Sequence, residues 1–289
     1  MGSKPILGVI GGTGLYNLPG LTNTETIEID TPFGKPSSPI FLGTIKSKRI
    51  AFLARHGIGH FLLPSEVNYR ANIYALKSLD IDKIVGVSAC GSLRDDYAPC
   101  DLVIPDQVID FTKNRERTFF GDGIVVHIGS ADPYCPELSA QVYKAVLESG
   151  ANVHYGGSFI TIEGPRFSTK AESNLFRSWG ISIIGMTNSP EAFLAREAEI
   201  CYATIAHVTD YDVWHESEES VNVEMIIKTL MNNTSIAKKS LEILIRDLNF
   251  ERVCNCSNAL ANSIITHSDI IPETTKIKLE LIIQKYINS

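Results

Sequence analysis

Short apolar runs alternate along the chain with segments of helical periodicity. Apolar runs that stop at glycine or polar residues indicate buried strands, and apolar spacings of three and four indicate amphipathic helices. The predicted strands are 4–10, 49–54, 83–88, 101–109, 158–162, 181–184 and 200–208. The predicted helices are 64–79, 137–149, 169–179, 190–199 and 221–248, with short helices after Cys256 and Pro272. Strands that alternate with helices indicate an α/β sheet covered on both faces.

Nothing in this pattern divides the chain. It contains no internal repeat and no Ser/Pro-rich linker, so a single domain over 1–289 is predicted, with 250–289 forming its C-terminal helices. The charged, glycine-bearing stretch 115–123 is predicted to be a mobile loop.

Polar, glycine-rich clusters follow the predicted strands. They occupy 11–14, 55–60, 88–92, 163–168, 185–188 and 209–212. Ligands of open α/β sheets bind beyond the carboxyl ends of the strands, so these clusters are expected to converge on one crevice.

The first cluster is Gly11-Gly12-Thr13-Gly14. Its backbone N–H groups and the Thr13 hydroxyl could cradle an anion, although a tight turn without a ligand fits the spacing equally well. It is not a P-loop, because no Gly-Lys-Ser/Thr follows, and Asn17 stands where a dinucleotide fingerprint needs its third glycine.

Other strand ends offer further phosphate donors. Arg55 could place two donors of its guanidinium on a phosphate, or it could form a structural ion pair. Ser88 and Thr187 could each add a hydroxyl. With Thr13, these residues would form a hydrogen-bonding phosphate site with one charge.

Asp210 and Asp212 are two residues apart, which in an extended chain directs both carboxylates to one side. Such a pair could bind a metal, share a proton or accept hydrogen bonds from a ligand. Because ionised carboxylates accept and do not donate, the pair favours an amino-purine over an oxo-purine. Phe167 and Met186 could sandwich a flat ring, or they could be ordinary core.

Composition and charge narrow the classes of partner. The 289 residues are 44% hydrophobic with a net charge of −7, which disfavours nucleic acid and anionic membranes. No apolar run approaches the roughly 18 residues of a membrane span, and the early glycines do not fit a signal peptide, so a cytoplasmic location is predicted.

No metal site is predicted. His56 and His60 lack an acid between them, and Cys254-Asn255-Cys256 has neither the C-x-x-C spacing nor a matching second pair, which indicates a structural or oxidisable cysteine pair.

Taken together, the clusters resemble the trimeric purine nucleoside phosphorylases, in particular the subfamily that cleaves methylthioadenosine. The matching motifs occur in family order from residue 5 to about 248. They are Gly11-Gly12-Thr13-Gly14-Leu15, Asp30-Thr31-Pro32-Phe33-Gly34-Lys35-Pro36, Leu53-Ala54-Arg55-His56-Gly57, Val67-Asn68-Tyr69-Arg70-Ala71-Asn72, Ala89-Cys90-Gly91-Ser92-Leu93, Thr161-Ile162-Glu163-Gly164-Pro165-Arg166-Phe167-Ser168, Met186-Thr187 with Pro190-Glu191, and Thr209-Asp210-Tyr211-Asp212.

The resemblance implies a single domain with a central mixed β-sheet flanked by helices, and it assigns roles to residues. Phosphate would be held by Thr13, Arg55, His56, Ser88 and Thr187. The nucleoside would lie against Ala89, Cys90, Gly91, Phe167, Ile184, Met186, Thr187, Asp210 and Asp212. Selectivity for the 5′-methylthio group would come from Ser168, Val223, Ile227 and His127, the last arriving from a neighbouring subunit.

Two positions depart from many family members. Ser88 replaces a threonine but keeps the hydroxyl, and Gly185 stands where animal members carry asparagine, which is typical of microbial members.

The implied activity is phosphorolysis of S-methyl-5′-thioadenosine in purine and methionine salvage. Asp210 would act as the acid at N7 of the purine, Arg55 would position phosphate, and phosphate would be a co-substrate with no metal or organic cofactor. A homotrimer, or a homohexamer, is implied. The alternatives are a broader phosphorylase acting on adenosine, methylthioinosine or 6-oxopurine nucleosides, a non-catalytic nucleoside sensor, and a dinucleotide enzyme.

Overall fold

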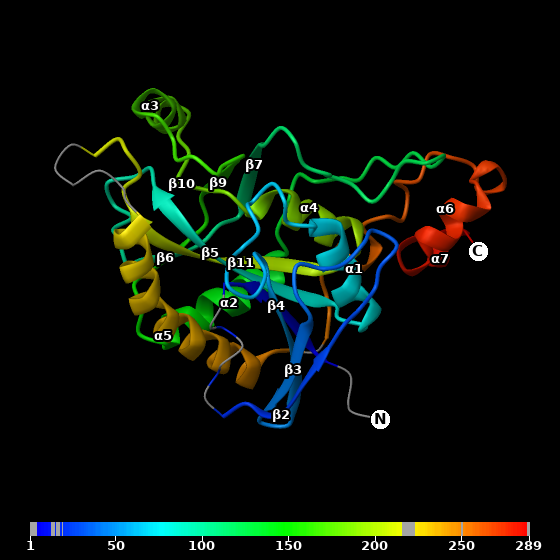
Figure 1. Cartoon of the computed structure of the whole chain (residues 1–289), viewed down its shortest axis with the longest axis horizontal. Helices are drawn as coiled ribbons and strands as arrows, with labels where there is room; N and C mark the ends of the chain where they lie inside the picture. The colour runs from blue at the N-terminus through cyan, green and yellow to red at the C-terminus, as the bar shows by residue number, and fades with distance from the viewer. Residues whose placement is uncertain are drawn as a thin grey trace.

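A central mixed sheet organises the chain (Figure 1). The computed structural model describes residues 5–12, 15, 18, 20–215, 223–249 and 251–287, with backbone only for 223–233. The strands are β1 (Leu7–Gly11), β2 (Thr22–Ile27), β3 (Ile40–Ile45), β4 (Lys48–Ala54), β5 (Lys83–Ser92), β6 (Leu102–Ile104), β7 (Gln107–Phe111), β8 (Val153–Tyr155), β9 (Ser158–Ile162), β10 (Ile183–Gly185) and β11 (Cys201–Asp210). The helices are α1 (Tyr69–Ser78), α2 (Pro136–Glu148), α3 (Lys170–Ser178), α4 (Asn188–Glu197), α5 (Val223–Asp247), α6 (Glu273–Lys278) and α7 (Glu280–Ile287), with 3₁₀ turns at Asn255–Asn258 and Ser268–Ile270.

The strand order is β2-β3-β4-β1-β5-β10-β9-β7, and β11 pairs with β5 and β6. Strands β4, β1, β5 and β11 are mutually parallel, so their carboxyl ends lie at one edge. Strand β10 is antiparallel to β5, which makes the sheet mixed and confirms the predicted fold class.

Helices cover both faces of this sheet (Figure 1). On β5, Val85 packs with the apolar residues of α2 and α5, whereas its neighbour Ile84 packs on the opposite face with those of α1 and α4. This opposition follows from the two-residue period of a strand. Burial on both faces explains why β5 and β11 are rich in apolar residues.

The structure corrects several predicted elements. The strand expected over 101–109 is two strands, because Pro105 lies between β6 and β7 and cannot donate to a ladder. The helix expected from residue 64 begins at Tyr69, capped by the Asn68 side chain, which accepts a hydrogen bond from the backbone N–H of Ala71. Strands β2, β3 and β8 were not predicted; β2 is polar and largely exposed.

Candidate active site

The antiparallel pairing of β5 and β10 brings two hydroxyls together. Ile184 lies opposite Gly91 in this ladder, and the same register continued beyond β10 places Thr187 opposite Ser88. The Thr187 hydroxyl accordingly donates to Ser88 Oγ over 3.3 Å, and both side chains are buried. Two of the predicted phosphate ligands are therefore neighbours, although they are 99 residues apart in sequence.

Arg55, directly after β4, is held in a buried ion pair. Its Nε and Nη2 donate to the two carboxylate oxygens of Glu191 at 2.7 and 2.8 Å, and both side chains are at most 2% exposed. Further bonds run to the carbonyl oxygens of Val87 at 2.9 Å and Ile10 at 3.3 Å. The two donors of Arg55 that were expected to bind phosphate thus bind Glu191. The guanidinium has five N–H groups, and these contacts use four of them, so one N–H on Nη1 remains.

His56 is neutral in this setting. Its Nδ1 donates to the Leu62 carbonyl at 2.9 Å, which leaves Nε2 as the acceptor nitrogen of the ring. Burial and the adjacent charge of Arg55 lower the pKa of His56 to about 4. A phosphate oxygen that carries a proton could therefore donate to Nε2.

The chain turns directly after β11, between Asp210 and Asp212. Asp210 pairs with Gly91 after a register irregularity, and Asp212 adopts a left-handed backbone with φ of 53°. The expectation that strand alternation would align the two carboxylates was wrong, since the chain is no longer extended at Asp212. Instead, the Asp212 N–H donates to Asp210 Oδ1 at 2.8 Å, and the Thr209 hydroxyl donates to Asp210 Oδ2 at 2.6 Å.

Unsatisfied polar atoms gather around Asp212. Its Oδ2 and the hydroxyls of Ser168 and Ser173 are buried without a hydrogen-bond partner among the described residues. Burial raises the pKa of the Asp212 carboxyl, although the nearby hydroxyls of Ser173 and Ser168 act in the opposite direction. Because unpaired buried polar atoms are costly, this group is suited to a polar ligand.

The glycine of β5 beside the carboxyl pair leaves no room for a side chain. A Cβ on Gly91 would lie 3.0 Å from Asp210 Oδ1 and 3.2 Å from Ile184. Cys90 is fully buried, and burial together with the charge of Asp210 raises the pKa of its thiol well above the usual value. Cys90 is therefore a neutral apolar wall.

The predicted ring-binding residues differ in exposure. Ile184 is buried and Met186 is half-buried. The Met186 sulfur lies against Gly164, since a Cβ added to Gly164 would be 2.6 Å from that sulfur. Phe167 is 38% exposed and Ala89 is half-buried. Of these four side chains only Ile184 is fully buried, so the other three leave some apolar surface exposed.

Some predicted site residues lie outside the described part of the chain. Thr13 is one of these, and for Val223 and Ile227, at the start of α5, only the backbone is described. His127 is exposed, and its backbone N–H donates to the Ser263 carbonyl at 2.9 Å.

Arg115 was missed as an anchor of this region. It is buried, and its guanidinium donates to the Tyr69 hydroxyl and to the carbonyl oxygens of Met186, Ser189 and Glu163 at 2.7–3.1 Å. The segment 115–123 was predicted to be a mobile loop, and this was wrong for Arg115, whose side chain is buried and hydrogen-bonded. No local signal distinguishes such an arginine, since its partners come from distant segments.

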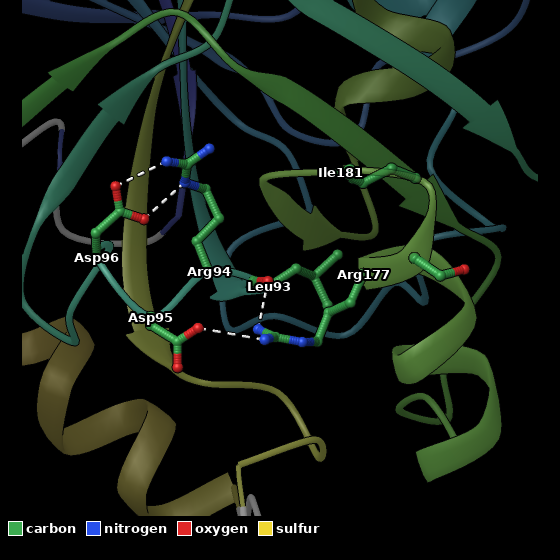
Figure 2. Close-up of a pocket in the computed structure, with 8 residues that line it drawn as sticks. Leu93, Arg94, Asp95, Asp96, Arg177 and Ile181 are labelled. Carbon is green, nitrogen blue, oxygen red and sulfur yellow. Dashed lines mark hydrogen bonds and ion pairs between the residues drawn. The ribbon is translucent and has the colours of Figure 1, made fainter.

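A separate cavity of about 600 Å³ lies beyond the end of β5 (Figure 2). It is bounded by 93–96 and by residues of 177–181, none of which is a predicted site residue. Its charges are paired, since Arg94 contacts Asp96 at 2.7 Å and Arg177 contacts Asp95 at 3.3 Å. We therefore take the edge formed by β4, β5, β10 and β11 as the candidate active site.

Comparisons with known proteins agree with this geometry. Residues 6–247 match the family model of the phosphorylase superfamily, and the chain belongs to that family. It is 53% identical over 285 residues to S-methyl-5′-thioadenosine phosphorylase of Geobacter sulfurreducens, covering 98% of this chain and all of the relative. It is 50% identical over 280 residues to the enzyme of the same name from Koribacter versatilis, covering 97% and 96% of the two chains.

Solved structures give the same class. A methylthioadenosine phosphorylase from an Antarctic soil metagenomic library superposes with a TM-score of 0.93 at 44% identity, covering 97% of this chain and 99% of that one. An adenosine/methylthioadenosine phosphorylase double mutant from Schistosoma mansoni, in complex with adenine, gives 0.82 at 35% identity, covering 91% and 100%. Within the described residues, no helix is long and apolar enough to cross a membrane.

Proposed function

We propose that this chain catalyses the phosphate-dependent cleavage of S-methyl-5′-thioadenosine to adenine and 5-methylthioribose 1-phosphate. The support is that the chain is 50–53% identical over nearly its whole length to enzymes of that name, and that the buried hydroxyls of Ser88 and Thr187 lie apart from the carboxyl groups of Asp210 and Asp212.

One observation carries the proposal: a single strand links the two halves of the site. Ser88 on β5 lies beside Thr187, and Gly91 on the same strand lies beside Asp210. Three residues of extended chain span about 10 Å, which is the scale of a phosphate and a nucleobase on opposite sides of a ribose. Such fixed placement favours the in-line attack that phosphorolysis requires.

In the proposed reaction, phosphate replaces Ser88 Oγ as the acceptor of the Thr187 hydroxyl. It also accepts from the Ser88 hydroxyl, from the remaining Nη1 proton of Arg55 and from Thr13, and it donates to His56 Nε2. A phosphate oxygen attacks C1′ as the N9–C1′ bond breaks, and that bonding pair leaves with adenine. Asp210, protonated or sharing a proton, donates that proton to N7 of the leaving base, while the Asp212 carboxylate accepts from the 6-amino group. General-acid help of this kind is worth roughly 10²–10⁴-fold.

The remaining assignments complete the proposal. Val223 and Ile227 border the 5′-methylthio group, with His127 supplied by a neighbouring subunit of a homotrimer or homohexamer. Ser168, expected at the same group, instead has its hydroxyl beside Asp212, at the end proposed for the base. The exposure of His127 fits that role. The reaction uses no metal or organic cofactor, and we propose that the enzyme acts in the cytoplasm.

The test is a substrate panel of methylthioadenosine, adenosine, methylthioinosine and inosine, each with and without phosphate. Adenine release from methylthioadenosine that requires phosphate, with the highest kcat/KM of the four, is expected. Equal turnover in phosphate-free buffer would show a hydrolase, and binding of methylthioadenosine without any turnover would show a sensor; either result overturns the proposal.

A further inference from the structure

Four of the six cysteines meet in one place, away from the candidate active site. Cys135 is the N-cap of α2, Cys201 is the first residue of β11, and Cys254 and Cys256 belong to the segment that follows α5. Their sulfur atoms all lie within 4.8 Å of one another, and the Cys201 and Cys254 sulfurs are 3.3 Å apart. All four are free thiols, and three of them are buried.

This arrangement fits a tetrahedral thiolate site. Zinc–sulfur bonds of about 2.3 Å place tetrahedral sulfurs roughly 3.8 Å apart, and the observed separations bracket that value. Two disulfides would require only two short sulfur–sulfur contacts. Here every sulfur is close to all three others, which a common central ligand explains.

The cysteines are held by regular backbone structure. The Cys135 N–H donates to the Tyr202 carbonyl at 2.8 Å, which ties the start of α2 to the start of β11. The Cys254 N–H donates to a carboxylate oxygen of Glu137 at 3.1 Å. Cys256 lies in the 3₁₀ turn Asn255–Asn258 and is buried. The ligand positions are therefore set before any ion binds, which favours affinity.

The surroundings suit negative charge. The Leu138 N–H, in the first turn of α2, donates to the Cys135 sulfur at 3.4 Å. The guanidinium of Arg252 interacts electrostatically with Cys201, Asp82 and Cys254, and its buried Nε has no hydrogen-bond partner of normal geometry among the described residues. Donors to sulfur and a nearby cation are the outer contacts that stabilise metal-bound thiolates.

We propose that Cys135, Cys201, Cys254 and Cys256 bind one zinc ion as a structural tetrathiolate centre. Binding releases four protons to solvent, one from each thiol, and leaves a net charge of −2 that Arg252 and the N-terminus of α2 offset. No electron is transferred. Sequence spacing conceals the site, because the ligands come from three segments separated by more than 50 residues each.

The centre is structural and takes no part in the reaction. Cys201 and Asp210 are the two ends of β11, so about 30 Å of extended chain separates the cluster from the carboxyl pair. The zinc ion would fasten the segment that leads to α6 and α7 onto α2 and β11. Its loss should therefore lower thermal stability and leave turnover at low temperature intact.

The experiment measures metal content of the full-length protein purified with a phosphine reductant and no chelator. Wild-type protein and the Cys100→Ser control, which alters an exposed cysteine outside the cluster, should each carry about one zinc per chain by mass spectrometry. Cys256→Ser should carry less than a tenth as much. A mercurial thiol reagent added to folded wild type should release the zinc, and cobalt(II) exchanged into the site should give the visible bands of a tetrahedral thiolate complex.

Removing zinc from wild type with a chelator should lower the Tm by about 5 °C or more, and restoring zinc sulfate should reverse the shift. This second measurement needs only wild-type protein, so it tests the proposal even if Cys256→Ser fails to fold. Wild type that holds less than a tenth of a zinc per chain after incubation with zinc sulfate would overturn the proposal. An unchanged zinc content in folded Cys256→Ser would also overturn it. The same holds if protein prepared without reductant contains two disulfides among these cysteines and does not take up zinc after reduction.

Discussion

Glu191 holds Arg55 with both of its carboxylate oxygens, and neither side chain has more than 2% of its surface exposed. The Tyr202 hydroxyl donates to the same carboxylate at 2.7 Å, and Gly86 makes room for that contact, since a Cβ there would lie 2.2 Å from the Tyr202 oxygen. The Arg55 guanidinium, which was expected to face phosphate, is thus held in place by the buried carboxylate of Glu191 on α4.

Glu191→Gln should destabilise the protein strongly, because it leaves the buried guanidinium of Arg55 without its counter-charge. The expected loss is about 3 kcal/mol of unfolding free energy, measured by denaturant titration. Asp96→Asn is the matched control, since it breaks an exposed ion pair with Arg94 and should cost less than about 1 kcal/mol. Equal losses of unfolding free energy in the two variants would show that the buried ion pair stabilises the protein no more than the exposed one.

Thr187→Val removes one hydroxyl from the proposed phosphate site and keeps the branched shape of the side chain. The KM for phosphate should rise about five- to tenfold, the scale of one hydrogen bond, and the KM for methylthioadenosine should change much less. Thr22→Val on the exposed strand β2 should leave both constants unchanged. An equal rise in both constants would argue against a role specific to phosphate.

Asp212→Asn replaces an acceptor-only carboxylate with a group that also donates. A 6-oxopurine can accept that hydrogen bond, so the ratio of kcat/KM for methylthioadenosine to that for methylthioinosine should fall at least tenfold. Steady-state kinetics with both nucleosides measures the ratio. If it stays constant while both rates fall together, Asp212 does not read the 6-position of the base.

Glu197 makes stability depend on pH. Burial raises the pKa of this carboxyl to about 7, against the pull of hydrogen bonds from the Phe119 N–H and the Thr118 hydroxyl. The folded state therefore binds a proton more tightly than the unfolded chain, whose carboxyl titrates near 4.5. This contribution is complete below pH 4.5 and is lost as the pH rises to 7, a change of roughly 2–3 kcal/mol.

Glu197→Gln should flatten that part of the stability profile, measured as unfolding free energy at pH 5, 6, 7 and 8. The exposed Glu116→Gln serves as the control and should keep the wild-type slope. A wild-type slope that persists in Glu197→Gln would assign the pH dependence to another group.

Apolar runs predicted the strands that build the centre of the sheet, because strands buried on both faces are mostly apolar. They did not reveal β2, whose sequence Thr-Asn-Thr-Glu-Thr-Ile is polar along its exposed length. Nor could they give the direction of β10, because that direction depends on its pairing with β5. In this pairing Ile183 lies opposite Ser92, which is 91 residues earlier in the sequence.

The candidate site shows the same division. Residue types at strand ends indicated an anion and an amino-purine, and the structure brings Ser88 next to Thr187 and Asp210 next to Asp212. The partners of buried charges were beyond reach of the sequence, because Arg115 is satisfied mainly by backbone carbonyl oxygens whose positions only the fold determines. The role of Thr13 stays a prediction.

Strand β5 hydrogen-bonds to β1, β10 and β11 and carries both Ser88 and Gly91. The proposed separation between the two reactants is thereby set by the three peptide units from Ser88 to Gly91, which neighbouring strands hold from both sides. Within the described residues, this rigid strand would keep the spacing of the two halves of the proposed site constant even when side chains around them are exchanged.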